Sequence, residues 1–300
     1  MYLHEDRELF NDIISAVNSQ TGIAQAIIEK DYYVTMILML LAQKNQNVVF
    51  KGGTSLSKCF HIINRFSEDI DITFTEHIGE SRRKKLKYKT IKSISEELEM
   101  PIENWDSTES DRDYNCYIFN YEPISDQIPA GITAGVKLET ALASYAFPTE
   151  QCKVSSIIYD AISNKVPDIM MKNNLMPFFM QVQSINRTFI DKIYALCDYY
   201  LRDETKRFSR HLYDIYKIYP NITINTAFKK LKEEVREHRS RLSICPSSKD
   251  NIDIKSIIAK FIEKEFFKHD YEDVTENLIT DAVTYEQCIQ VLKKVVYELF

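Results

Sequence analysis

The sequence is poor in the two residues that most often interrupt regular structure, with 6 glycines and 8 prolines among 300 residues. This scarcity excludes a low-complexity array, and a hydrophobic content of 44% excludes a disordered chain. No run approaches the roughly 18 uncharged apolar residues that a membrane span needs. The acidic start MYLHEDRELF also lacks the apolar core of a secretory signal. We therefore expect a soluble protein that works in the cytoplasm and does not engage a membrane.

The six cysteines are scattered, without a C-x-x-C pair or clustered histidines, which excludes a zinc knuckle and a disulfide framework. The formal net charge of −6 gives no overall attraction to nucleic acid. One segment differs, because residues 82–92 contain seven basic residues and no acidic one: Arg82, Arg83, Lys84, Lys85, Lys87, Lys89 and Lys92. It is either a local patch for a polyanion or a solvated helix face or loop.

Hydrophobic periodicity predicts an α+β fold. Helices are expected at residues 5–18, 23–43 and 55–63 and from the basic segment to about residue 98; strands are expected at 47–50, 68–74, 114–122, 131–141 and 177–185. Beyond residue 184 the segments are helical in period and composition, apart from a turn at 246–251. We therefore predict a sheet domain with N-terminal helices over residues 1–185 and a helical domain over 186–300.

Two of the few glycines, Gly52 and Gly53, stand together between an apolar strand and a helix, followed by Thr54 and Ser55. A glycine pair at such a junction allows positive φ, and it aims free backbone N–H groups and a helix N-terminus at an anion. The hydroxyl groups add donors. A plain tight turn explains this motif nearly as well when it is taken alone.

Asp69 and Asp71 lie two residues apart on the strand that follows, so both carboxylates project from one face. Such like charges repel unless a cation lies between them, and Mg²⁺ prefers hard oxygen ligands shared with substrate phosphates. Two solvent-facing aspartates are the alternative, but the preceding glycine junction favours a metal site. Glu139, on the polar face of the strand at 131–141, is the candidate third carboxylate; a surface Lys137–Glu139 pair is its alternative.

The helical part also carries charged residues at regular intervals. Lys192 lies in the first turns of a helix capped by Ser184 or Thr188. Arg207, Arg210, His211 and Asp214 fall on one face of the next helix. These positions alone are compatible with a salt-bridged surface and a structural histidine.

Five segments in this order resemble the AbiEii/AbiGii family of nucleotidyltransferase toxins, a branch of the DNA polymerase β-like nucleotidyltransferase superfamily. They are IIEKDYYVTMIL (27–38), FKGGTSLSK (50–58), RFSEDIDITF (65–74), RTFIDKIYAL (187–196) and RHLYDIYKI (210–218). The resemblance spans most of residues 27–218 and covers the basic segment and the C-terminal part only loosely.

The resemblance implies a role for each matching residue. Gly52, Gly53, Thr54 and Ser55 would hold the phosphates of a nucleoside triphosphate, with Asp69 and Asp71 as ligands of the catalytic Mg²⁺ or Mn²⁺. Lys192 and Asp214 match two later motif residues needed for nucleotide binding and activity. Asp191 stands where Glu is common before the lysine, and Leu212 where an aromatic residue is common after the histidine.

The resemblance also implies a biological setting. The enzyme would transfer a nucleoside monophosphate to an acceptor, with RNA such as the tRNA 3′ end as the expected acceptor. It would act as a growth-inhibiting toxin in a bacterial toxin–antitoxin, abortive-infection or phage-defence system with a cognate antitoxin protein. The residues alone leave two alternatives open: transfer to a small molecule or a protein, and a non-catalytic nucleotide- or RNA-binding protein.

Overall fold

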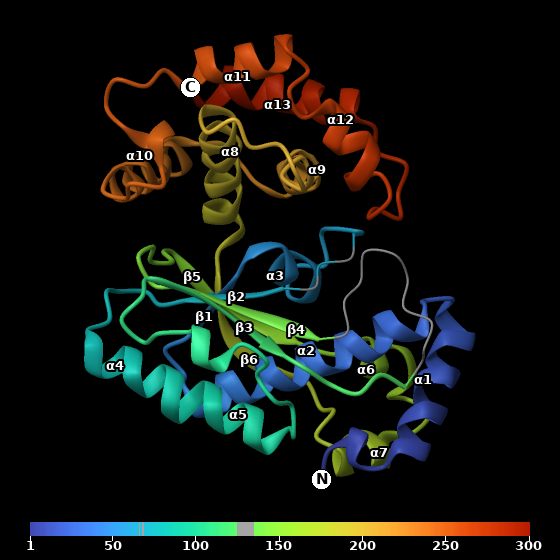
Figure 1. Ribbon diagram of the computed structural model, residues 1–300. Coiled ribbons are helices and arrows are strands. Elements are labelled where there is room, and N and C mark those ends of the chain that lie inside the picture. The colour runs from blue at the N-terminus through green and yellow to red at the C-terminus, as the bar shows by residue number, and fades with distance from the viewer. Residues whose placement is uncertain (66, 68, 125–134) are drawn as a thin grey trace. The chain divides into compact units, whose positions relative to one another are not determined.

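The structure is a computed structural model that describes residues 1–65, 67, 69–124 and 135–300. The chain forms two compact units, unit 1 from residues 1–59 and 68–182 and unit 2 from residues 60–67 and 183–300 (Figure 1). The short segment 60–67, which sequence analysis placed in the first domain, therefore belongs to unit 2. Arg65 forms an isolated β-bridge with Ile279, and the Thr280 N–H donates to the Asn64 carbonyl at 2.8 Å.

Unit 1 begins with a 3-10 turn, η1 (Leu3–Glu5), and two helices, α1 (Arg7–Thr21) and α2 (Gln25–Lys44). The Asp6 side chain caps α1 by accepting from the Leu9 N–H, and Gly22 ends it in the left-handed region at φ 73°. Helix α2 is buried on nearly all sides, in keeping with its apolar sequence. Both helices lie within two to three residues of their predicted bounds.

A six-stranded mixed sheet forms the centre of unit 1, in the order β3-β4-β2-β1-β6-β5. Its strands are β1 (Val49–Lys51), β2 (Ile70–Thr73), β3 (Tyr114–Phe119), β4 (Val136–Ala141), β5 (Thr149–Val154) and β6 (Phe178–Gln183). The pairs β1–β2 and β3–β4 are antiparallel, whereas β1–β6 and β2–β4 are parallel. The α+β class is confirmed. Residues 131–134 of the predicted strand lie outside the described residues, and β5 was not predicted.

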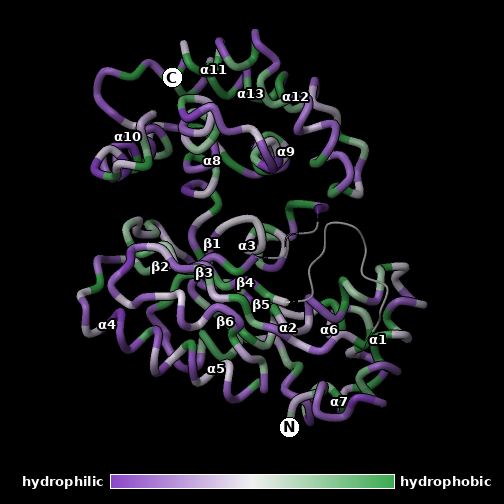
Figure 2. The backbone as a smooth tube through the Cα atoms, in the orientation of Figure 1, coloured by the Kyte–Doolittle hydropathy of each residue, from purple (hydrophilic) through white to green (hydrophobic). Residues whose placement is uncertain are grey.

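The two faces of this sheet differ in polarity. Phe50, Ile72, Leu138 and Phe119 are fully buried on one face, which α2 contacts through β4. Alternation then places Asp71 and Glu139 on the other face, as predicted. Figure 2 shows the hydrophobic residues of the sheet and α2 at the centre of the unit.

The remaining helices of unit 1 are short. They are α3 (Gly52–Lys58), α4 (Glu80–Lys85), the π-helical turn η2 (Leu86–Ile91), α5 (Lys92–Glu97), η3 (Trp105–Ser107), α6 (Ile157–Ile162) and α7 (Pro167–Lys172). Helix α3 begins at Gly52, not Ser55, and ends at Lys58, not Ile63. Its last turn is anchored by the buried Lys58, whose Nζ lies 2.6 Å from Asp31 Oδ1, and His61 then reverses the chain at φ 52°.

Unit 2 is helical, as the sequence predicts. It contains α8 (Ile185–Leu201), α9 (Arg210–Ile218), η4 (Tyr219–Asn221), α10 (Thr226–Ser240), η5 (Pro246–Ser248), α11 (Ile254–Glu263), α12 (Lys268–Asp270), η6 (Tyr271–Thr275) and α13 (Tyr285–Leu299). Helix α9 packs on α8 and α13.

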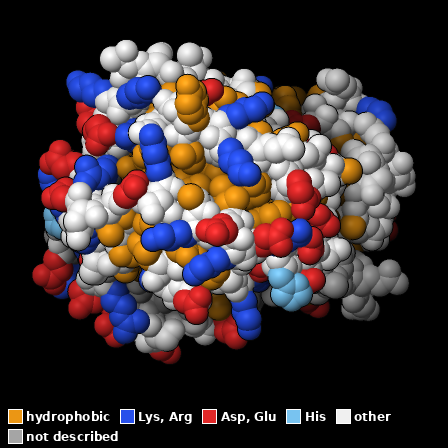
Figure 3. All heavy atoms as spheres, turned by 90° about the horizontal axis from the view of Figure 1, so that it is seen from above, with side chains coloured by type: hydrophobic (Ala, Val, Ile, Leu, Met, Phe, Trp, Pro, Cys, Tyr) orange, Lys and Arg blue, Asp and Glu red, His pale blue; other side chains and the backbone are white. Residues whose placement is uncertain are grey.

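No helix in the described ranges is long and apolar enough to cross a membrane. The face in Figure 3 exposes hydrophobic side chains bordered by charged ones.

Candidate active site

The glycine junction of unit 1 lies directly against one of the predicted carboxylates. Gly52 has φ 80°, which an L side chain rarely adopts. A Cβ atom at this position would lie 2.0 Å from Asp71 Oδ2, so the carboxylate occupies the space that a side chain would need. Gly52 is therefore required both by its backbone conformation and by the close approach of Asp71.

Four side chains form a row across the polar face of the sheet. In the strand register Lys51 pairs with Asp71, Asp71 with Glu139, and Glu139 with Cys116. Residues at the same register of neighbouring strands project to the same face, with Cβ atoms about 5 Å apart. The structure thus brings Asp71 and Glu139 together as predicted and adds Lys51 and Cys116, which the sequence analysis did not identify.

The electrostatics of this row are those of crowded like charges. Burial and, after it, the neighbouring carboxylates of Asp71 and Asp69 together raise the pKa of Glu139 to about 7. Burial and the charge of Glu139 also raise the pKa of the Cys116 thiol, to about 11. At neutral pH Glu139 therefore holds its proton for much of the time, and a cation placed beside it would release that proton.

The donor set fits a hard divalent cation that shares its ligands with a substrate. Asp69, Asp71 and Glu139 offer only carboxylate oxygens, the ligands that Mg²⁺ and Mn²⁺ prefer. In the described part of the chain, no group of three or more His, Cys, Asp or Glu side chains is arranged to hold a metal ion by itself. Mg²⁺ usually takes one or two carboxylates and completes its shell with phosphate oxygens and water, so the Asp71–Glu139 pair suffices.

Thr54 and Ser55 lie in the first turn of α3, but their hydroxyl groups point inward. The Thr54 hydroxyl donates to the Asp69 carbonyl at 2.6 Å, and the Ser55 hydroxyl donates to the Gly52 carbonyl at 2.8 Å. Both side chains are almost fully buried. They therefore brace the junction rather than offer hydroxyl donors, and the groups left for an anion are the first N–H groups of α3, which have no intrahelical acceptor.

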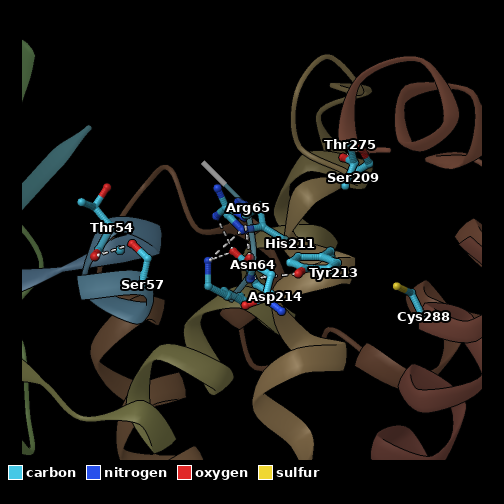
Figure 4. Close-up of polar contacts among 12 residues, drawn as sticks. Thr54, Ser57, Asn64, Arg65, Ser209, His211, Tyr213, Asp214, Thr275 and Cys288 are labelled. Carbon is cyan, nitrogen blue, oxygen red and sulfur yellow. Dashed lines mark hydrogen bonds and ion pairs between the residues drawn. The ribbon is translucent and has the colours of Figure 1, made fainter. Parts of the chain in front are cut away.

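Unit 2 contains a second, buried cluster around Asp214 in α9 (Figure 4). Arg65 binds the Asp214 carboxylate through both oxygens, with Nε–Oδ1 at 2.7 Å and Nη2–Oδ2 at 2.8 Å. The ammonium group of Lys192 donates to Asp214 Oδ2 at 2.6 Å. Asp214 has no exposed surface, and these two cations hold the pKa of its carboxyl group well below its usual range against the opposing effect of burial.

His211 completes this cluster. Its Nδ1 lies 3.3 Å from Lys192 Nζ, and burial together with the Lys192 charge lowers its pKa well below 6.5. The imidazole is therefore neutral and accepts from the ammonium group. Tyr199 stacks on the His211 ring at 5.7 Å, and Phe208 stacks on Tyr199 at 3.6 Å. His211 thus belongs to the site of Lys192, a role that the sequence alone did not assign.

Arg65, which the sequence analysis quoted within RFSEDIDITF but did not single out, is a member of the Asp214 cluster. Its only sequence signal is its position four residues before Asp69, which does not indicate a partner at Asp214.

The prediction that Arg207 lies on the face of this helix was wrong, because α9 begins at Arg210 and Arg207 has φ 65°. Ser184 is the cap of α8, since its side chain accepts from the Arg187 N–H.

The basic segment follows α4, η2 and α5, and its seven cations divide into two groups. Lys87 is buried, donates to the Thr108 carbonyl, and lies 4.7 Å from the Trp105 ring centre. Arg83 donates to the Ile78 and Asp111 carbonyls and to Asp113. These two side chains hold the fold together. The others are exposed: Arg82, Lys84, Lys85, Lys89 and Lys92.

A glycine junction packed against paired carboxylates, in a chain with a sheet unit and a helical unit, is the arrangement that the resemblance to nucleotidyltransferases led us to expect. The chain belongs to the AbiEii family, since the family model described as the nucleotidyl transferase AbiEii toxin of type IV toxin–antitoxin systems matches residues 38–290. The predicted family is confirmed, and the protein is a nucleotidyltransferase toxin.

A solved structure supports the fold. The chain is similar to MenT4, nucleotidyltransferase toxin Rv2826c from Mycobacterium tuberculosis H37Rv, with 17% identity and a TM-score of 0.55. The match covers 95% of this chain and 89% of that chain. No curated protein matches the sequence.

Proposed function

We propose that the protein is a Mg²⁺-dependent enzyme that transfers a nucleoside monophosphate from a nucleoside triphosphate to RNA, with the tRNA 3′ end as the favoured acceptor. It would act in the cytoplasm as the toxin of a bacterial toxin–antitoxin pair or phage-defence (abortive-infection) system, restrained by a cognate antitoxin protein. The main observation behind the proposed chemistry is that Asp71 and Glu139 are paired on neighbouring strands, with Asp71 in the space that a side chain at position 52 would need.

In this proposal the carboxylates of Asp69, Asp71 and Glu139 would hold Mg²⁺, or Mn²⁺ in its place. The bound ion would neutralise charge on the triphosphate and favour attack by the acceptor hydroxyl. The acceptor oxygen would form a bond to the α-phosphorus and lose its proton to water, while the bond from the α-phosphorus to the bridging oxygen breaks and pyrophosphate leaves. The chain contributes by positioning these groups and balancing their charge, which is the main task in phosphoryl transfer.

The triphosphate would be held by the free N–H groups at the start of α3, at Gly52 and Gly53, with Thr54 and Ser55 bracing the turn. Lys192 would supply a cation for nucleotide binding. Asp214 is fully buried and already binds Lys192 and Arg65, so we assign it as a positioning residue that fixes the Lys192 ammonium group. The exposed cations of the basic segment, Arg82, Lys84, Lys85, Lys89 and Lys92, would bind the phosphate backbone of the RNA acceptor.

Transfer can be tested directly. The purified protein is incubated with total bacterial tRNA, Mg²⁺ and each of the four α-labelled nucleoside triphosphates, beside an Asp71→Asn control. We expect label in RNA with one or two of the nucleotides and none in the control. Label on protein or a small molecule would replace RNA as the acceptor, and bound nucleotide without transfer to any acceptor would contradict catalysis.

A further inference from the structure

The face of α9 that carries His211 and Asp214 begins with a further charged residue, Arg210. It is the first residue of α9 and lies one turn before Asp214, at the i, i+4 spacing that lets two helical side chains meet. Its neighbour His211 lies 3.3 Å from Lys192 Nζ. Arg210 is half-buried, so it borders the Asp214 cluster and is not a fully solvated surface residue.

Arg210 differs from the other cations of the cluster because it has no ionic partner. Within the described residues its guanidinium group forms neither a hydrogen bond nor an ion pair. An arginine at this spacing from an aspartate commonly pairs with it. Here Asp214 instead accepts from Arg65 through both oxygens and from Lys192 through Oδ2. The predicted salt-bridged face is therefore incomplete at its first residue.

The carboxylates of the neighbouring segments have other partners. Asp281 binds Lys217 at 2.7 Å, and Glu204 binds Arg202 at 3.0 Å. Asp270 accepts from two backbone N–H groups in the turn before α9, at 2.7 and 3.0 Å. None of the three forms an ion pair with the guanidinium group at the start of α9, within the part of the chain that the structure describes.

The cluster therefore holds positive charge in excess, since three cations, Arg65, Lys192 and Arg210, stand against the single carboxylate of Asp214. His211 is neutral and does not change this balance. Burial, followed by the charges of Arg65 and Arg210, lowers the pKa of Lys192 against the opposing effect of Asp214. Like charges held this close to a buried ammonium group are unfavourable unless an anion joins them.

The substrate of a nucleotidyltransferase supplies such an anion. A nucleoside triphosphate carries several negative charges on adjacent phosphates. A guanidinium group presents its N–H donors in a planar fork that matches two phosphate oxygens, whereas an ammonium group acts as a compact point charge. The two kinds of cation can therefore bind neighbouring phosphates of one chain.

We propose that Arg210 is a phosphate-binding residue of this enzyme, with its guanidinium group and the Lys192 ammonium group donating to neighbouring phosphates of the nucleoside triphosphate. This role rests on the nucleotide binding proposed above for Lys192. It would select a triphosphate over a monophosphate, because a monophosphate offers a single phosphate to the two cations.

The test is calorimetric titration of the full chain, in the presence of Mg²⁺, with α,β-methylene analogues of the four nucleoside triphosphates and with the four monophosphates. Wild type is compared with Arg210→Gln, Arg210→Lys and the control Arg241→Gln, an exposed arginine at the end of α10. We expect Arg210→Gln to lower triphosphate affinity about tenfold or more, the usual effect of losing a hydrogen bond between charged groups. Monophosphate affinity should change less than about twofold, and Arg210→Lys should restore part of the loss.

Urea unfolding without nucleotide and steady-state transfer separate this role from a structural one. Because Arg210 has no partner to lose, Arg210→Gln should be as stable as wild type or more so, and the KM for the triphosphate should rise more than kcat falls. A less stable Arg210→Gln, or an equal loss of monophosphate and triphosphate affinity, would overturn the proposal. Unchanged triphosphate affinity in Arg210→Gln would overturn it alone, whereas no triphosphate binding by wild type would overturn the proposed nucleotide site as well.

Discussion

The two charged clusters of this protein are built on opposite principles. In unit 1 burial, together with the nearby carboxylates of Asp71 and Asp69, raises the pKa of Glu139 to about 7. In unit 2 the carboxylate of Asp214 binds two cations, Arg65 and Lys192, which lower its pKa against the opposing effect of burial. Like charges held close indicate a site that an added cation completes, whereas opposite charges held together fix the positions of their side chains. The first arrangement is suited to binding a cation, and the second would hold the Lys192 ammonium group in position for the proposed nucleotide binding.

The sharpest test of this difference is Asp71→Asn. Removing one of the crowded charges should lower nucleotidyl transfer by about 1000-fold or more, because it removes a ligand for the phosphate-bound cation. It should not lower the free energy of unfolding, because repulsion is relieved. Label transfer and urea unfolding measure the two effects. Asp106→Asn, an exposed aspartate outside the row, is the control. A loss of stability like that of a core variant would contradict the comparison.

The matching change in unit 2 is Asp214→Asn, and its effect should fall on stability. Arg65 and Lys192 would be left buried beside a neutral amide, and breaking a buried ion pair in this way costs about 3–5 kcal/mol. Urea unfolding of Asp214→Asn beside Asp71→Asn measures the contrast. Equal stability of the two variants would show that the Asp214 cluster does not hold unit 2 together.

The third test separates backbone strain from crowding at the carboxylates. Gly52 and Gly22 have similar positive φ, 80° and 73°, but only Gly52 has an atom in the way of a side chain. Both Gly→Ala variants should lose about 1–2 kcal/mol of stability from the left-handed backbone. Gly52→Ala should in addition lower transfer about 10–100-fold by displacing Asp71. Unchanged transfer in Gly52→Ala would show that the position of Asp71 is not critical.

The pH dependence of metal binding should be smaller but distinct. Glu139, with a pKa of about 7, must lose its proton before it can bind a cation. The affinity for Mn²⁺, measured by electron paramagnetic resonance, should therefore rise about tenfold from pH 6 to pH 8, and Glu139→Gln should abolish this rise. A pH-independent affinity in wild type would remove Glu139 from the metal site.

The same pKa shifts act on stability with opposite signs. Glu139 has a raised pKa in the folded protein, so without metal its contribution falls as pH rises from about 4.5 to about 7. Asp214 has a lowered pKa, so its contribution is present above about 3.8 and is lost as pH falls below that value.

The placement of Asp71, Glu139 and the glycine turn in unit 1 could be predicted from the sequence because it depends on local patterns. The alternation of residues 69–74 placed both aspartates on the polar face, and the glycine pair marked the turn beside them. The partner strand of β2 could not be derived from spacing, yet the alternation within β4 correctly put Glu139 on that face. Strand β5 was missed because TEQCKV is polar and largely exposed, so it lacks the hydrophobic alternation that identifies a strand.

Unit 2 was less predictable because its cluster depends on contacts between distant segments. Arg65 and Asp214 are 149 residues apart, and no periodic pattern links them. A charge on a helix face is compatible with solvent exposure until tertiary structure covers it. For that reason the sequence alone could not assign His211 to this cluster; the assignment depends on the structure, which places it beside Lys192.

The last test concerns the basic segment, in which only five of the seven cations are exposed. Replacing Lys84, Lys85 and Lys89 with alanine should lower RNA use about fivefold at low salt and reduce the salt dependence of binding by about one unit of slope for each lost phosphate contact. Transfer per bound RNA should be unchanged, because the carboxylate row is intact. Lys229→Ala with Lys230→Ala, two exposed lysines of α10, is the control. Unchanged RNA binding and salt dependence in the triple variant would remove this segment from the acceptor site and leave its exposed cations as a solvated helix face.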